Sequence, residues 1–180
     1  MLGTSGNLSV LTQTESLQFL ITVSGKDKGE LIEDDFILVD ENGKSTHHML
    51  PSAETLLHSA IYKHTNAKAV FHVHTTNSTL LSIKSKDNVS FSGLEMLKGL
   101  GFKTHEVDIS IPVIENNQNM KYLSEIAPNY INENVPGLIL RGHGIYAWGK
   151  SIEEAKKHVE IFEFLFEYRI KELSLNSIKS

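Results

Sequence analysis

The sequence predicts an α/β protein in which helices cover a central sheet of mixed or antiparallel character. Segments with the apolar patterns of strands and of helices interleave along the chain. Tight turns join the early strands, which favours antiparallel pairing, because parallel strands need long crossover connections. The length of 180 residues fits one domain with a sizeable core. We therefore expect a single domain over residues 1–180, with a polar tail from about residue 174.

Short segments rich in apolar and β-branched residues predict the strands of the first half. A glycine-bounded stretch, residues 24–29, predicts a loop after the second of these strands. Asn42 and Gly43 form a dipeptide that is typical of a hairpin turn, directly after the third. The three predicted strands lie at residues 8–11, 18–23 and 36–39.

Polar capping residues and apolar positions at helical spacing predict four helices. Ser52 is expected to cap the first. Residues 92–95 and 151–154 both have the Ser-x-x-Glu form of a capping box, which predicts the starts of the second and fourth helices. Residues 121–131 form the predicted third helix. The aromatic stripe of the fourth helix has the spacing of a core-facing surface, so we expect it to be buried.

Two histidines at alternate positions are the strongest functional signal in the chain. His72 and His74 belong to residues 69–74, a segment whose alternation predicts a strand. Side chains two apart on a strand point to the same face, with Cα atoms roughly 6.5 to 7 Å apart. Both imidazoles can therefore reach one cation. The pair alone also fits buried histidines that hydrogen-bond to carbonyl groups.

A third histidine strengthens the prediction of a metal site. His143 has a glycine on each side and lies in a turn between predicted strands at residues 138–140 and 145–148. Glycine leaves the backbone bare, so a metal or substrate can approach closely. Three histidines with an open fourth position are typical of a catalytic metal site, because structural sites are usually closed by four protein ligands.

The composition narrows the classes of function. The sequence has no cysteine, which excludes disulfides and thiolate ligands, so nitrogen and oxygen must hold any metal. The net charge of −5 gives no reason to expect nucleic acid or an anionic membrane as partner. No apolar run approaches the roughly 20 residues of a membrane span. The first residues lack the basic and apolar segments of a signal peptide, so we expect a cytoplasmic enzyme.

With these segments placed, the chain resembles the class II aldolase and adducin-head superfamily. The resemblance covers nearly the whole chain, and its specificity comes from the order of the segments. It is greatest to the dehydratases of the superfamily, which act on a phosphorylated ketose. Members usually carry a further helix ahead of the first segment, so we expect a helix-forming stretch upstream in the reading frame. The matching segments are TSGNLS at 4–9, SGKDKG at 24–29, SAETLLH at 52–58, HVH at 72–74, EMLKG at 95–99, IPVIEN at 111–116 and RGHGIYAWG at 141–149.

The resemblance implies a role for each polar residue in the matching segments. His72, His74 and His143 would bind a divalent cation, which we expect to be zinc, although imidazole also suits iron and nickel. Glu95 matches the position that the dehydratases use as general acid and base. Glu54 matches the carboxylate of the sugar-phosphate aldolases and is expected here as a substrate contact. Both glutamates also have a purely structural explanation. Glu95 fits a capping box, and Glu54 fits a first helical turn, where a carboxylate complements the helix dipole.

The resemblance also implies a site for the phosphate group of the substrate. A compact anion needs many donors at short range, and backbone amides and small hydroxyl groups supply them. Asn7, Ser24, Gly25 and Ser52 match the family pattern, with Lys26 as a counter-charge. Ser52 would add the positive end of a helix dipole. Taken singly, each of these residues also fits ordinary turn and capping chemistry.

The implied reaction removes water from a phosphorylated ketose through a metal-stabilised enediolate, in a homo-oligomer that by resemblance is a ring-like tetramer. An aldolase or epimerase would use the same enediolate and break or remake another bond. The segments at residues 95–99 and 111–116 argue against this alternative. A non-enzymatic interaction domain, as in adducin heads, would keep the fold without the metal site. The three histidines argue against this second alternative.

Overall fold

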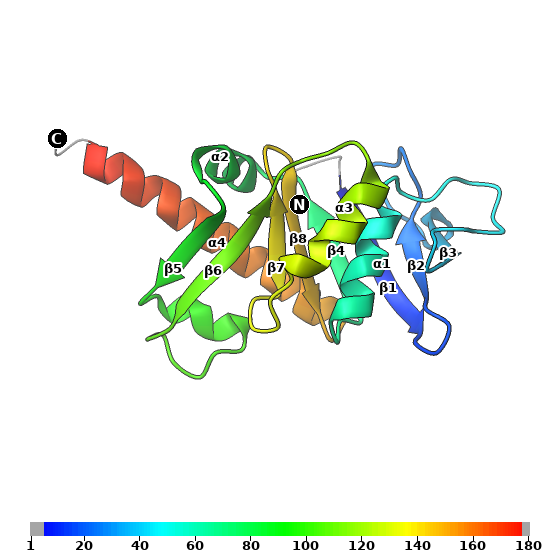
Figure 1. Cartoon of the computed structure of the whole chain (residues 1–180), viewed down its shortest axis with the longest axis horizontal. Helices are drawn as coiled ribbons and strands as arrows, with labels where there is room; N and C mark the ends of the chain where they lie inside the picture. The colour runs from blue at the N-terminus through cyan, green and yellow to red at the C-terminus, as the bar shows by residue number, and fades with distance from the viewer. Residues whose placement is uncertain (1–5, 178–180) are drawn as a thin grey trace.

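The computed structural model describes residues 6–177 and shows an eight-stranded mixed sheet with helices on both faces (Figure 1). The strand order is β3-β2-β1-β4-β8-β7-β6-β5. Neighbouring strands are antiparallel, except that β6 and β7 are parallel. The predicted α/β class and the mixed character of the sheet are confirmed.

The strands are β1 (Gly6–Gln13), β2 (Gln18–Thr22), β3 (Phe36–Asp40), β4 (Ala69–Val73), β5 (Asn88–Ser92), β6 (Asp108–Ile114), β7 (Gly137–Leu140) and β8 (Gly144–Gly149). The α-helices are α1 (Thr55–His64), α2 (Thr76–Lys84), α3 (Met120–Ile126) and α4 (Ile152–Ser177). Three short 3₁₀ helices are η1 (Glu33–Asp35), η2 (Glu95–Leu100) and η3 (Ala127–Asn129). In the part of the chain that the structure describes, no helix is both long and apolar enough to cross a membrane.

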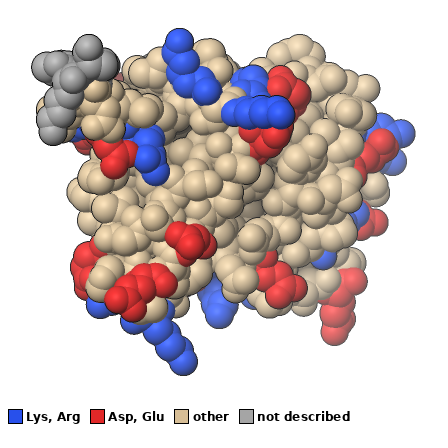
Figure 2. Space-filling model, turned by 60° about the vertical axis from the view of Figure 1, so that its left-hand side comes forward, with Lys and Arg blue, Asp and Glu red and all other residues tan. Residues whose placement is uncertain are grey.

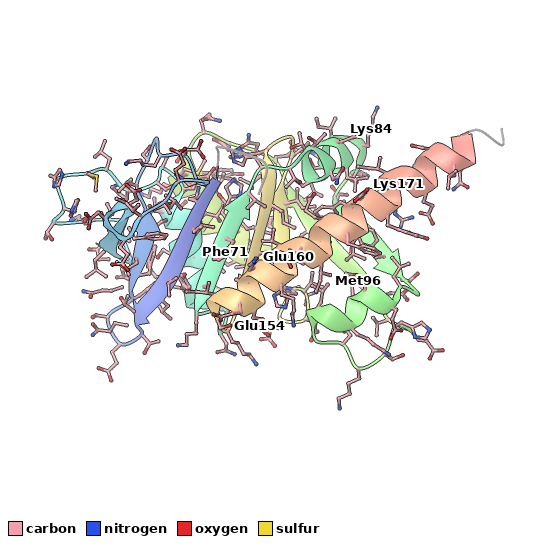
Figure 3. The ribbon with its side chains drawn as sticks, turned by 180° about the vertical axis from the view of Figure 1, so that it is seen from behind. Phe71, Lys84, Met96, Glu154, Glu160 and Lys171 are labelled. Carbon is pink, nitrogen blue, oxygen red and sulfur yellow. The ribbon has the colours of Figure 1, made fainter. Side chains whose placement is uncertain are left out.

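Two hydrophobic cores lie on opposite faces of the sheet. Helices α1 and α3 cover one face, while α4 crosses the other together with α2 and η2 (Figure 1). The central strand β4 is buried along its whole length, so its alternate side chains enter different cores. Val70 belongs to the core under α1 and α3, and Phe71 to the core under α4 (Figure 3). His72 follows Val70 at a spacing of two and therefore points to the α1 face.

The predicted fourth helix begins as its capping signal indicates. Glu154 donates its backbone N–H to Ser151 Oγ at 3.2 Å. Phe162 and Phe166 of its aromatic stripe are fully buried, as expected. The predicted polar tail from residue 174 is helical up to Ser177, and residues 178–180 lie outside the described part.

Three local predictions are wrong. Asn42 and Gly43 do form a turn, in which Gly43 N–H donates to Asp40 O, but no strand follows to complete a hairpin. Ser52 does not cap α1, because the helix begins later and Glu54 holds the N-cap position. Residues 92–95 do not form a capping box, since Ser92 ends β5. At residues 92–95, strand pairing overrides the local signal, because Ser92 lies opposite Asp108 in β6.

The third helix and three unpredicted elements complete the comparison. Helix α3 ends at Ile126 and continues as the 3₁₀ helix η3, so residues 121–131 are only partly α-helical. Helix α2 and strands β5 and β6 were not predicted from the sequence.

The face over the β5–β6 end of the sheet has few charged side chains at its centre, and most of them lie around its margin (Figure 2).

Candidate active site

The pairing of β4 with β8 brings the three predicted histidines together. The two strands are antiparallel, with His72 opposite Tyr146, so the end of β4 lies beside the start of β8. His74 follows β4 and His143 precedes β8, so the two histidines meet at the same end of the paired strands. His72 Nε2 lies 2.8 Å from His74 Nε2 and 3.4 Å from His143 Nε2.

Glu54 joins this cluster from the start of α1. Its carboxylate oxygens lie 3.3 Å from His72 Nε2 and 3.2 Å from His143 Nε2. One ligand atom from each of Glu54, His72, His74 and His143 lies within 4.8 Å of all the others. The sequence predicted Glu54 as a substrate contact, whereas the structure places its carboxylate among the imidazole nitrogens.

The hydrogen bonds and burial of the histidines suit a metal. His72 Nδ1 lies 3.1 Å from the Ile145 carbonyl oxygen and can only donate to it, which leaves Nε2 with a lone pair aimed at the cluster. Burial, with His74 and His143 nearby, lowers the pKa of His72 well below its usual value. Burial also lowers the pKa of His74. Three neutral imidazoles and one carboxylate fit a divalent cation such as zinc.

Glycine is required where the two strands meet. A Cβ added at Gly144 would lie 2.4 Å from the Val73 carbonyl oxygen and 3.1 Å from ring carbons of both His72 and His74. Any side chain at this position would push the rings apart. The glycine beside His143 therefore permits the histidine cluster to close, in addition to exposing backbone.

A cavity of about 490 Å³ opens directly beside the cluster. It contains Glu54 and His74 in its wall, so a molecule bound there would touch the candidate ligands. The structure also brings together the residues predicted to bind phosphate, together with Lys28, which the sequence did not single out. These cavity-lining residues are Asn7, Ser24, Gly25, Lys26, Lys28 and Ser52.

The two lysines of the cavity are held differently. Lys26 Nζ lies 3.1 Å from Asp35 Oδ1, and its side chain is half exposed. Lys28 Nζ donates to the carbonyl oxygens of Val23 at 3.3 Å and Lys26 at 2.7 Å, which folds the loop back on itself. Burial lowers the pKa of Lys28 despite the nearby acidic groups. The loop thus places two ammonium groups, together with Asp27 and Asp35, at one end of the cavity.

Glu95 lies away from the cluster within one chain. From β4 to β8, β7, β6 and β5, the pairings are antiparallel, antiparallel, parallel and antiparallel, so β4 and β5 run in opposite directions. The histidines follow the end of β4, and Glu95 follows the end of β5. The two therefore lie at opposite ends of the strands (Figure 1). Its exposed carboxylate lies 2.6 Å from Lys98 Nζ and 3.5 Å from His105 Nδ1.

Behind the cluster lie His58 and Tyr146, which the sequence analysis missed as functional residues, and Asn7, which it assigned only to the phosphate. Asn7 donates to Glu54 Oε2 at 2.6 Å and also contacts His58, so only part of it faces the cavity. His58 is fully buried, and burial lowers its pKa to about 3. Tyr146 stacks on His72 with ring centroids 4.0 Å apart. The sequence signals for His58 were its place at the end of the matching segment 52–58 and its helical spacing of four residues from Glu54.

Comparisons with known proteins agree with this architecture. The family model for the Class II Aldolase and Adducin N-terminal domain matches residues 1–170. A methylthioribulose-1-phosphate dehydratase from Bacillus subtilis is 43% identical over 173 residues, which cover 93% of this chain and 83% of that protein. Its counterpart from Persephonella marina is 46% identical over 169 residues, covering 92% of this chain and 79% of the relative.

A solved structure extends the agreement to three dimensions. L-fuculose-1-phosphate aldolase from Thermus thermophilus superposes with a TM-score of 0.67 at 26% identity, over 94% of this chain and 86% of the aldolase. The match includes most of both chains, so it concerns the whole domain and not one motif. The chain therefore belongs to the family of class II aldolase and adducin N-terminal domains.

Proposed function

We propose that this protein is a methylthioribulose-1-phosphate dehydratase of methionine salvage. It would remove water from 5-methylthioribulose 1-phosphate and form 2,3-diketo-5-methylthiopentyl 1-phosphate in the cytoplasm. The observation that carries the proposal is the cluster of three histidines and Glu54, which opens into a cavity lined by lysines and small polar residues. The names of relatives that are more than 40% identical favour dehydration over aldol cleavage.

The cluster would hold one divalent cation, for which zinc is our proposal. His72, His74 and His143 supply neutral nitrogen and Glu54 supplies an anionic oxygen. When bound, such a cation acts as a Lewis acid on the oxygens of the ketose, which favours loss of the proton from C3.

The phosphate group would lie in the same cavity, against the loop that follows β2. Ser24, Gly25 and Ser52 would donate hydrogen bonds, while Lys26 and Lys28 would supply charge. This arrangement leaves the carbonyl end of a ketose phosphate beside the cluster, because Glu54 and His74 line the same cavity.

Glu95 would accept the proton from C3 as a carboxylate and then donate it to the C4 hydroxyl group, which leaves as water. Because Glu95 and the cluster lie at opposite ends of the strands, this role requires a second copy of the chain. We therefore propose a homo-oligomer, a tetramer by resemblance, in which Glu95 of one subunit reaches the cluster of its neighbour. The side chain of Glu95 is 71% accessible, so a neighbouring subunit can reach it beside its contacts with Lys98 and His105.

A complementation experiment tests this arrangement. Glu95→Gln and His143→Ala should each be inactive alone. Mixed oligomers of the two variants should regain activity, because some interfaces combine an intact Glu95 with an intact cluster. If mixing restores nothing although the subunits exchange, Glu95 does not act across an interface.

Incubation with 5-methylthioribulose 1-phosphate tests the reaction itself. The zinc-loaded protein should form the diketone, detected by its ultraviolet absorbance and by mass. L-fuculose 1-phosphate serves as the matched control for aldol cleavage. Release of an aldehyde from either substrate would favour the aldolase alternative, and a folded protein that takes up no metal would favour the interaction domain.

A further inference from the structure

A chain of buried hydrogen bonds leads from Glu54 into the space between β1 and α1. Asn7 Nδ2 donates to Glu54 Oε2 at 2.6 Å, and Asn7 Oδ1 contacts His58 Nε2. His58 Nδ1 lies 2.6 Å from Ser9 Oγ, which in turn lies 2.7 Å from Tyr62 OH. Asn7, Ser9 and His58 are buried, so water does not compete for these bonds.

The chemistry of the groups assigns a direction to each bond. A carboxylate only accepts, so Asn7 must present its NH₂ group to Glu54 and its oxygen to His58. That oxygen needs a donor, which places the ring proton of the neutral imidazole on Nε2. Nδ1 then accepts from the Ser9 hydroxyl, and the Ser9 oxygen accepts from Tyr62. Every donor in this chain meets an acceptor.

Glu54 needs such support because nothing local fixes its side chain. It occupies the N-cap position of α1 but makes no side-chain capping bond. Its carboxylate has a strong hydrogen-bond donor in Asn7, and Asn7 in turn depends on His58. Groups that orient a metal ligand in this way commonly change metal affinity about 10- to 100-fold when they are removed.

We propose that Ser9 and His58 are positioning residues that hold the Glu54 carboxylate in the cluster through Asn7. The Asn7 oxygen requires the ring proton on Nε2 of His58, and the Ser9 hydroxyl satisfies Nδ1 and so holds the ring in place. If the proton moved to Nδ1, Nε2 would turn a lone pair toward the Asn7 oxygen. The amide would then rotate and aim its oxygen at Glu54, and repulsion would displace the carboxylate. The inference rests on the proposed function, in which Glu54 is a metal ligand.

Two substitutions at one position separate positioning from packing. His58→Gln places an amide NH₂ near the former Nε2–H and preserves the donor to Asn7. His58→Asn places its amide near the former Nδ1 and removes that donor. Both variants bury one amide in the same space, so a loss of stability is common to both. Ser9→Ala leaves the buried Nδ1 of His58 without a partner and loosens the ring, and Tyr62→Phe removes only the last bond of the chain.

Titration of the metal-free proteins with Zn²⁺ gives the first readout. His58→Asn and Ser9→Ala should bind Zn²⁺ about 10- to 100-fold more weakly than the wild type. His58→Gln and Tyr62→Phe should stay close to the wild type. Equal affinities in all variants, or losses that follow only their melting temperatures, would overturn the inference.

The ¹⁵N chemical shifts of His58 in the metal-free protein give a second readout that needs neither metal nor substrate. The wild type should show the Nε2–H tautomer, and so should Ser9→Ala, because the Asn7 oxygen still needs a donor. An Nδ1–H tautomer in the wild type would overturn the inference. If both readouts come out as expected but 5-methylthioribulose 1-phosphate is not dehydrated, the inference stands and the proposed function falls.

Discussion

At the scale of single residues, the candidate site depends on where nitrogen lone pairs point. His72 is tied to Ile145 through Nδ1 and rests flat against Tyr146, so its Nε2 has one orientation. His74 and His143 reach the same point from the ends of two neighbouring strands. A metal bound there would replace the close contacts between these ring nitrogens with coordinate bonds.

Removal of single histidines should separate metal binding from folding. His74→Ala and His143→Ala should lose bound metal and activity with little change in melting temperature, because both side chains are only partly buried. His72→Ala should also melt lower, since it leaves a cavity under Tyr146. Metal content by mass spectrometry and circular dichroism check this. A variant with one full equivalent of metal would show that its residue is not a ligand.

The two glutamates should respond differently to loss of charge. Glu95→Gln should retain metal and lower the dehydration rate by about 10²- to 10⁴-fold, because it cannot transfer a proton. Glu54→Gln should lower metal affinity first, since its carboxylate lies within the cluster. Rates at saturating zinc, together with metal content, distinguish the two. If Glu54→Gln abolishes turnover with metal bound and Glu95→Gln does not, the acid-base roles are reversed.

At the scale of elements, several hydrogen bonds join α2 to the turn that carries His143, and Arg141 contributes most of them. Arg141 donates to the carbonyl oxygens of Ser82, Ser85 and Lys86 at the end of α2. Its Nε donates to Glu115 at 2.5 Å. A guanidinium can serve these acceptors at once because its donors form a rigid planar fork. The turn before β8 is therefore held in place by a helix that the sequence analysis did not predict.

Arg141→Lys should loosen this turn, because one ammonium group cannot reach all four acceptors. We expect Zn²⁺ affinity to fall by about 10-fold, the range found for groups that support metal ligands. Arg169→Lys is the matched control, since Arg169 joins α4 to the Ser90 carbonyl oxygen far from the cluster. Calorimetric titration of both variants checks the prediction. Equal affinities in the two variants would contradict it.

At the scale of the whole molecule, the sheet keeps two functional groups apart. The histidines lie at one end of the strands and Glu95 at the other. One chain therefore carries both groups, but its own Glu95 cannot reach its own histidines. The area over β5 and β6 that has few charged side chains is compatible with close contact between subunits (Figure 2). Assembly would thus be part of the chemistry that we propose.

Stability should fall in acid because His58 is buried without charge. Its folded pKa of about 3 lies below its ordinary value of 6.5. Between these values the unfolded chain binds a proton that the folded chain does not, so the free energy of unfolding decreases as the pH falls below 6.5. The loss is of the order of several kcal/mol. Denaturant melts from pH 7 to 4 measure it, and His58→Gln should show a flatter pH dependence.

The sequence by itself determined the features that rest on local pattern. Alternation placed His72 and His74 on one face, and the glycines marked His143 as closely approached. The strand and helix patterns predicted the α/β class, and the order of the motifs led to the family. These predictions could be made from the sequence because each depends on residues that lie only a few positions apart.

Only the tertiary structure decided which distant groups meet. It placed Glu54 among the histidines and showed that Asn7 serves Glu54 and His58, which lie 47 and 51 residues along the chain. It also showed that, within one chain, Glu95 lies far from the site to which the resemblance assigns it. The physical reason is that strand pairing and helix docking set such contacts, and burial then selects which polar partners are satisfied. No local pattern carries that information.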